Sequence, residues 1–200
     1  MNTRDYSRDI TEIRSMMERS SKFLSLSGWA GIMAGLYALT GAWVAYSRFN
    51  FYPDGVYYSP SELPEIIMLA LLILVLALST AFYLSWRKSD NRGEKVWNAT
   101  SRRLLTQMAV PLVTGGILIL VFISKGLIGL IAPLSLLFYG LALYNAGNFT
   151  FNAIKVLGII QIALGLLSSW LIGYGLLLWA FGFGVMHVVY GIYIHIRYER

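Results

Sequence analysis

The sequence predicts an all-α integral membrane protein, a bundle of six transmembrane helices that follows an N-terminal cytoplasmic amphipathic helix. Three observations support this fold class: the composition, six long apolar segments, and the placement of the basic residues. Of the 200 residues, 57% are hydrophobic and only 13% are charged, whereas soluble domains carry about 25% charged residues. So few charged side chains cannot coat a water-soluble globule, and part of the surface must therefore face lipid.

The first 22 residues predict a helix with two different faces. Tyr6, Ile10, Ile13 and Met17 recur at helical spacing, and charged residues occupy the opposite face. Such a helix either binds a cytoplasmic protein partner or lies on the membrane surface, where it could continue into the first span. The sequence leaves both alternatives open.

Six apolar segments are long enough to cross a bilayer, since roughly 20 apolar residues in a helix span its hydrocarbon core. The transmembrane domain covers residues 23–196, with spans expected at about 23–46, 65–86, 104–124, 126–146, 153–171 and 173–196. The last two come from residues 156–196, which contain no Lys, Arg, Asp or Glu. At ~1.5 Å per residue this run is too long for one crossing. A turn is expected near "SSWLIGYG" at residues 168–175, where Ser and Gly accumulate.

Basic residues are concentrated on one side of this arrangement. Only Arg48 and Lys125 fall on the side opposite the termini; the other basic residues lie in the N-terminal segment, in the 87–103 loop, at Lys155 and in the tail at 197–200. Because basic residues near span ends stay in the cytoplasm, both termini are expected there. The same distribution accounts for the net charge of +6. It resembles no compact basic patch, so no nucleic-acid partner is expected.

Small residues recur every three or four positions in several spans. In lipid, such residues allow two helix backbones to approach closely. The expected packing positions are Gly28, Gly31, Gly35 and Ala38 in span 1, Gly158 and Gly165 in span 5, and Gly184 and Gly191 in span 6. The partner helix could belong to the same chain or to a second copy, which leaves a homo-oligomer open. Span 2 has no glycine and is expected to be the most lipid-exposed helix, while Pro111 and Pro133 are expected to kink spans 3 and 4.

The only two histidines, His187 and His195, both lie in span 6. They are about 12 Å apart along a helix, too far to bind one metal ion together. The chain has no cysteine, and residues 96–198 contain no Asp or Glu, so no metal or cofactor is expected. His195 is expected at the cytoplasmic interface. His187 is interpreted as a packed side chain hydrogen-bonded to Gln161 or Asn145; a role in proton transfer is the alternative.

The spans contain no recognisable catalytic motif. Neither a G-x-S-x-G sequence nor a phosphate-binding loop is present, and intramembrane carboxylates are missing. The sequence therefore favours a non-enzymatic membrane protein with a sensing, regulatory or accessory role, acting through residues 1–22 and 87–103. The alternative is a small oligomeric transporter or channel, with Gln161, His187 and Asn145 along a polar path.

The stretch "MMERSSKFLSLSGWAGIMAGLYALTGA", residues 16–42, resembles the opening of a group of uncharacterised small multi-pass bacterial inner-membrane proteins. The glycine-led segments "GGILILV" and "LGIIQIAL" are similar, more loosely, to the six-span acid-resistance membrane proteins. The resemblance implies an origin in the bacterial plasma membrane. It implies no catalytic or binding residues.

Overall fold

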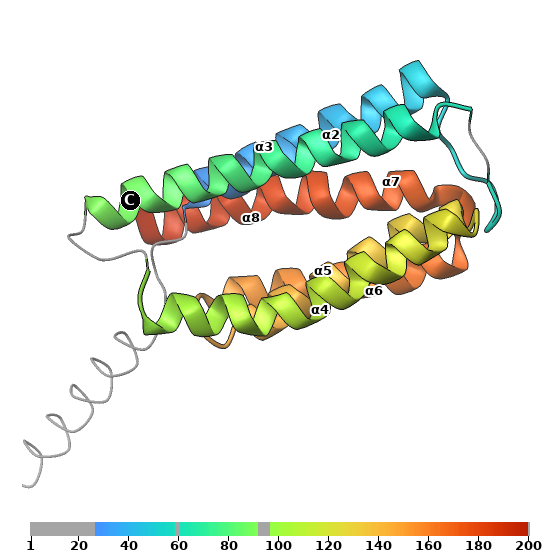
Figure 1. Cartoon of the computed structure of the whole chain (residues 1–200). Coiled ribbons are helices and arrows are strands. Elements are labelled where there is room, and N and C mark those ends of the chain that lie inside the picture. The colour runs from blue at the N-terminus through green and yellow to red at the C-terminus, as the bar shows by residue number, and fades with distance from the viewer. Residues whose placement is uncertain (1–26, 59–60, 92–96, 200) are drawn as a thin grey trace, which may run out of the picture.

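The computed structural model describes residues 27–58, 61–91 and 97–199, which form helices and short connections (Figure 1). The helices are α2 (Gly28–Phe49), α3 (Leu63–Asp90), α4 (Ala99–Ser124), α5 (Ile131–Ala146, after the 3-10 turn Ile128–Leu130) and α6 (Asn152–Trp170), followed by a composite last span. Six helical segments are long and apolar enough to cross a membrane, which confirms a multi-pass membrane protein in contact with lipid. The amphipathic helix expected at residues 1–22 lies outside the described residues.

The last span, Ile172–Glu199, changes its helix type along its length. After the 3-10 turn Ile172–Tyr174 come α7 (Gly175–Trp179), the π-helix η3 (Ala180–Met186), α8 (His187–Ile194) and the π-helix η4 (His195–Glu199). π-Helical turns are rare and often lie at functional sites. The π-helical segment η3 is therefore a candidate functional region of the bundle.

The last span lies between two groups of helices (Figure 1). On one side, α2 packs against α8 and η3, and α3 packs mainly against α2. On the other side, α5 packs against both α4 and α6. The short helix α7 contacts α5 and α6. The last span consequently makes contacts with both groups and connects them.

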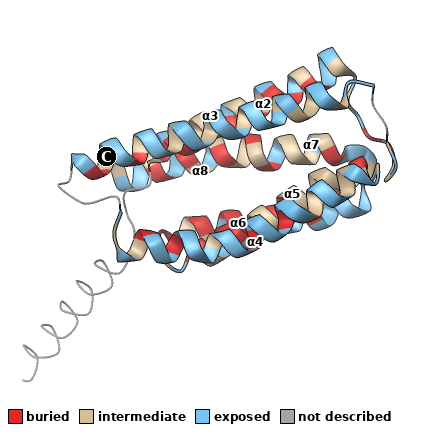
Figure 2. Cartoon of the chain, viewed as in Figure 1, coloured by how far each residue is buried: buried red, intermediate tan, exposed pale blue. Residues whose placement is uncertain are grey.

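Many large apolar side chains are exposed, as expected where lipid is the solvent. Figure 2 shows that exposed residues lie along all of the long helices. The most apolar stretch of α3 contains no buried residue, which makes α3 the least buried of the six spans. This agrees with the exposure expected from its glycine-free sequence. A small buried cluster of Leu104, Leu143, Ala146, Ile154 and Leu157 joins α4, α5 and α6.

A local capping signal explains where α4 begins. α4 begins at Ala99, five residues before the expected start of span 3, because Asn98 and Ser101 form a capping box. The Ser101 amide donates to Asn98 Oδ1 at 2.8 Å, and the Asn98 amide donates to Ser101 Oγ at 2.9 Å. Pro133 was expected to kink span 4. It lies in the first turn of α5, where a backbone nitrogen needs no partner within the helix, and it therefore does not interrupt the helix.

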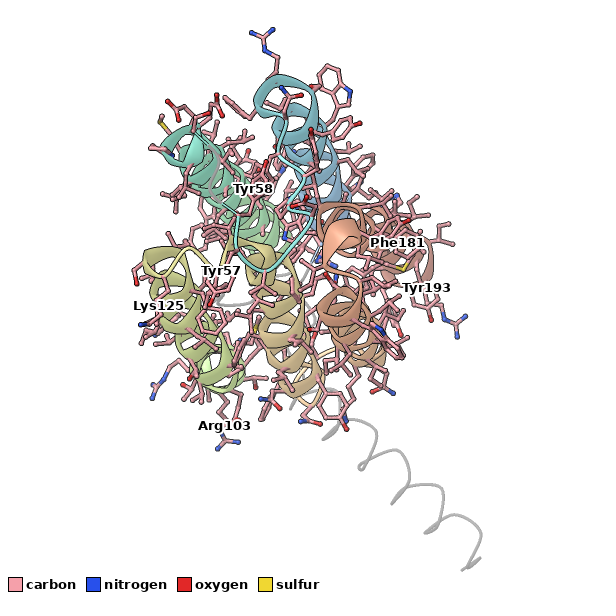
Figure 3. All side chains as sticks on the ribbon, turned by 90° about the vertical axis from the view of Figure 1, so that its right-hand side faces the viewer. Tyr57, Tyr58, Arg103, Lys125, Phe181 and Tyr193 are labelled. Atoms are coloured by element: carbon pink, nitrogen blue, oxygen red, sulfur yellow. The ribbon has the colours of Figure 1, made fainter. Side chains whose placement is uncertain are left out.

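The loop after α2 folds back over one end of the bundle, where Figure 3 labels Tyr57 and Tyr58. The Tyr58 amide donates to the Gly126 carbonyl at 3.3 Å, and the Gly129 amide donates to the Val56 carbonyl at 3.1 Å. A Cβ on Gly129 would overlap the carbonyl of Gly55. The loop is thus held on the turn between α4 and α5 by backbone contacts.

Candidate functional site

Three polar side chains meet in the interior where α5, α6 and the last span come together. Gln161 of α6 is fully buried and His187 of α8 is 6% exposed. Tyr139 of α5 completes the group, which is called the Tyr139–Gln161–His187 cluster below. Polar groups at this depth require partners inside the protein, because lipid supplies none.

The hydrogen bonds of the cluster converge on one backbone carbonyl, that of Gly182 in η3. Gln161 Nε2 donates to this oxygen at 2.8 Å, and His187 Nδ1 lies 3.0 Å from it. Because a carbonyl oxygen can only accept, Nδ1 of the imidazole must carry the proton. In the neutral ring Nε2 then accepts from the Tyr139 hydroxyl, 2.9 Å away. Gln161 Nε2 and His187 Nδ1 lie 3.5 Å apart. Both are donors to the same carbonyl, so they do not hydrogen-bond to each other.

The packing of Gly182 and Phe183 positions the cluster. A Cβ on Gly182 would lie 2.5 Å from Gln161 Oε1 and 2.6 Å from Leu136 Cδ2, so a larger residue there would have to displace the ends of these two side chains. The Phe183 ring stacks on the His187 imidazole with an interplanar angle of 10° and a centroid distance of 5.8 Å. These contacts hold the imidazole between the Gly182 carbonyl and the Tyr139 hydroxyl.

Two buried polar atoms beside the cluster have unused hydrogen-bonding capacity. Gln161 Oε1 and Ser168 Oγ have no hydrogen-bond partner within the described part of the chain. The two residues are seven positions apart on α6 and therefore share one face of the helix. Buried polar atoms of this kind are usually satisfied by water or by a ligand, so this face of α6 is the polar side of the interior.

The three residues that the sequence indicated as an intramembrane polar site are not all brought together. Gln161 and His187 share the Gly182 carbonyl. Asn145 is half-buried near the end of α5, and among the described residues no hydrogen bond joins its side chain to either of them. Sequence reasoning missed Tyr139, which supplies the hydroxyl instead. No group of three or more His, Cys, Asp or Glu side chains in the described ranges could hold a metal ion.

The expected packing glycines lie at two helix contacts. Gly28, Gly31 and Gly35 of α2 face Gly184 and Gly191 of the last span, and this contact is called the glycine seam. Gly158 of α6 lies against the backbone of Gly140 and Tyr144 in α5, and Gly165 lies against Pro133 and Leu137. Ala38 is 3% exposed within α2. The last span is therefore held to α2 by close backbone contact and to α5 and α6 by polar contacts.

A second polar group ties three helices together at the end of the bundle where the last span ends. Glu199 Oε1 accepts from Lys88 Nζ of α3 and from the Gly28 amide of α2, each at 2.9 Å. Glu199 Oε2 lies 2.7 Å from His195 Nδ1, one helical turn earlier. His195 also makes an edge contact with the Trp29 ring at 5.5 Å. The i, i+4 spacing of His195 and Glu199 is visible in the sequence and could have indicated this pair.

Comparison with known proteins gives no assignment. No protein-family model matches the chain, and neither a curated protein nor a solved structure matches it.

Proposed function

We propose that this membrane protein is non-enzymatic and has a sensing, regulatory or accessory role in the bacterial inner membrane, with the last span as its responsive element. The observation that carries this proposal is the Gly182 carbonyl within η3, which accepts from both Gln161 and His187. The cluster stabilises the π-helical form, because it fixes Gly182 and His187 relative to α6. A π-to-α conversion would rotate one part of the span relative to the other and would break these bonds.

This arrangement suits a two-state element. Discrete packing arrangements convert small local changes into larger movements of a helix. The last span contacts α2 through glycines and α5 and α6 through hydrogen bonds, so a change in the cluster would shift one helix group relative to the other. Residues 1–22 and residues 87–103 are the proposed contacts for a cytoplasmic protein partner. The second segment was expected to be a loop, but it includes the end of α3 and the start of α4 as well as the connection between them.

A small oligomeric transporter or channel is the second candidate, and the unpaired Gln161 Oε1 and Ser168 Oγ favour it. In that case both atoms would line a polar path. Gln161 is fully buried and His187 is 6% exposed. Neither side chain lines the groove between α2 and α3 or the pocket at the Glu199 end of the bundle. Enclosure of the cluster supports the regulatory proposal.

Accessibility of a cysteine at position 168 tests the two candidates. The chain has no native cysteine, so Ser168→Cys gives a single thiol of nearly the same size as the hydroxyl it replaces. We expect no reaction with a membrane-impermeant maleimide in intact cells or in inverted vesicles, because Ser168 is fully buried. Asp54→Cys, in an exposed loop, is the labelling control. Rapid labelling of Ser168→Cys from either side would favour a polar path and a transporter.

The proposed orientation places both termini in the cytoplasm. It is supported by the concentration of basic residues on the side of the termini, and the resemblance of residues 16–42 supports the inner membrane. A reporter enzyme that is active only outside the cytoplasm should be inactive when fused after Arg200. The same reporter inserted at Asp54 should be active. Activity of the Arg200 fusion would contradict the proposed orientation.

A further inference from the structure

An open groove between α2 and α3 lies next to a polar pocket at the Glu199 end of the bundle. The groove has a volume of about 500 Å³ and is lined by Trp29, Met33, Ser79, Thr80, Tyr83 and Leu84. The polar pocket has a volume of about 320 Å³ and is lined by Ser27, Leu84, Arg87, Lys88, Asn91 and Glu199. Leu84 lines both, so the two lie next to each other, and the lining changes from mainly apolar in the groove to polar in the pocket.

The groove presents an apolar surface in spite of its hydroxyl groups. Thr80 Oγ1 lies 3.2 Å from the Tyr37 hydroxyl of α2, so these two groups satisfy each other. The remaining lining is formed mainly by Trp, Met, Tyr and Leu side chains. The groove is open on the outer surface of the bundle, where α3 exposes its apolar side chains. An acyl chain could enter it directly from the bilayer.

Among the described residues, the polar pocket carries one positive charge that no neighbouring carboxylate neutralises. Lys88 and Glu199 neutralise each other at 2.9 Å. Both Glu199 oxygens already contact protein donors, the Gly28 amide on one and His195 on the other. Arg87 is exposed, and no ion pair of its side chain is found among the described residues. Its guanidinium is therefore the group that can receive an anion, and the Ser27 hydroxyl and Asn91 amide are neutral donors beside it.

We propose that the groove and the polar pocket together bind one anionic phospholipid, with its phosphodiester on Arg87 and one acyl chain along the groove. A guanidinium suits a phosphodiester because it can donate two parallel hydrogen bonds. The aromatic rings of Trp29 and Tyr83 fit the interfacial depth between headgroup and acyl chain. Basic pockets of this kind between helices are a known mode of headgroup recognition on the cytoplasmic side.

The same contacts select against a zwitterionic headgroup. The ammonium group of such a lipid is stabilised by a nearby negative charge. Glu199, the one carboxylate among the described lining residues, already contacts Lys88, His195 and the Gly28 amide. A singly charged phosphodiester with an uncharged alcohol, as in phosphatidylglycerol, matches the Arg87 guanidinium, which has no ion pair among the described residues.

Lipid titration of the purified full chain tests the headgroup contact. In a neutral detergent, the chain should retain one dioctanoyl phosphatidylglycerol in native mass spectrometry and bind it more tightly than dioctanoyl phosphatidylcholine. Arg87→Gln should weaken phosphatidylglycerol binding about fivefold, the change expected for one basic residue at a membrane surface. Arg103→Gln, on α4 well away from the groove (Figure 3), makes the same change of charge and should leave the affinity unchanged.

A second pair of variants tests the groove. Ser79→Trp places a large ring in the groove and should abolish lipid retention, whereas Leu78→Trp, at an exposed neighbouring position, should not. Inorganic phosphate alone should not protect the chain from thermal unfolding, because it lacks the acyl chain. Equal affinity for the two lipids would overturn the proposal, and so would an equal effect of the Arg87 and Arg103 substitutions. A dimer that forms in wild type and is lost in Arg87→Gln would assign the surface to a second copy instead.

Discussion

Replacing Gly35 with alanine is expected to lower the melting temperature of the purified protein, whereas the same replacement at Gly116 should leave it unchanged or raise it. A Cβ on Gly35 would lie 2.6 Å from the Gly184 carbonyl oxygen and 2.9 Å from the Val188 amide nitrogen. Both atoms belong to the backbone of the last span and cannot move aside alone. Overpacking of this kind costs about 1–3 kcal/mol in the free energy of unfolding, and Gly35→Leu should be more damaging.

Gly116 is a matched control because a Cβ there meets nothing within 4 Å. It lies inside α4 and is exposed, so alanine changes only the helix propensity, which favours alanine by about 1 kcal/mol. The comparison of Gly35→Ala with Gly116→Ala therefore distinguishes overpacking at the glycine seam from the general effect of replacing a glycine in a helix. Equal melting temperatures of the two variants in detergent would show that the glycine seam does not hold the last span to α2.

The seam should also be reciprocal. A Cβ on Gly28 would lie 2.5 Å from the Gly191 carbonyl oxygen, and a Cβ on Gly191 would lie 2.5 Å from the Gly28 carbonyl oxygen. Each substitution forces the same two backbones apart. Gly28→Ala already separates the two backbones, so adding Gly191→Ala should cause little further overlap. The double variant should therefore lose less stability than the sum of the losses in the two single variants.

Much of the fold could be predicted from the sequence, because six apolar segments and their small residues are local properties of the chain. The changes of helix type in the last span could not. In our proposal the π-helical segment is stabilised by the hydrogen bond from Gln161 to the Gly182 carbonyl, which joins two residues 21 positions apart in sequence. The start of α4 at Ala99 could have been predicted from the sequence, because the Asn98–Ser101 pair is a local capping signal. It was missed because the apolar run begins several residues later.

The candidate site, too, could be predicted from the sequence only in part. Gln161 and His187 stand out as polar residues in apolar runs, and the structure joins them through one carbonyl. Tyr139 could not be chosen over Asn145, because the choice depends on how far α5 is displaced along its neighbours. That displacement is set by tertiary contacts such as Gly140 against Gly158, which no periodicity in α5 alone can reveal.

Replacing His187 with phenylalanine is expected to destabilise the protein by about 1–3 kcal/mol, the usual effect of leaving a buried polar group without its partner. Phenylalanine has a similar shape and retains the stacking on Phe183. It leaves the Tyr139 hydroxyl without its acceptor, and it removes one of the two donors to the Gly182 carbonyl. Tyr144→Phe, at an exposed tyrosine of the same helix α5, is the control and should unfold like the wild type.

A double-mutant cycle attributes the loss to the cluster. Tyr139→Phe removes the hydroxyl that meets His187 Nε2, so it should destabilise the wild type but have little further effect in the His187→Phe background. Unfolding in detergent, followed by circular dichroism, measures all four proteins. Fully additive effects would mean that Tyr139 and His187 act independently, in disagreement with their 2.9 Å contact.

His187→Gln separates a packing role from a role in protonation. Glutamine keeps one donor for the Gly182 carbonyl and one acceptor for the Tyr139 hydroxyl, but it cannot take up a proton near neutral pH. If the imidazole serves only to hold η3 in its π-helical form, the variant should keep both its stability and its activity in the phenotype of the gene deletion. Normal stability with lost activity would instead assign His187 to proton transfer or to the sensing step itself. The Gly182 carbonyl would still accept from Gln161 in that variant, so the loss could not be attributed to collapse of the last span.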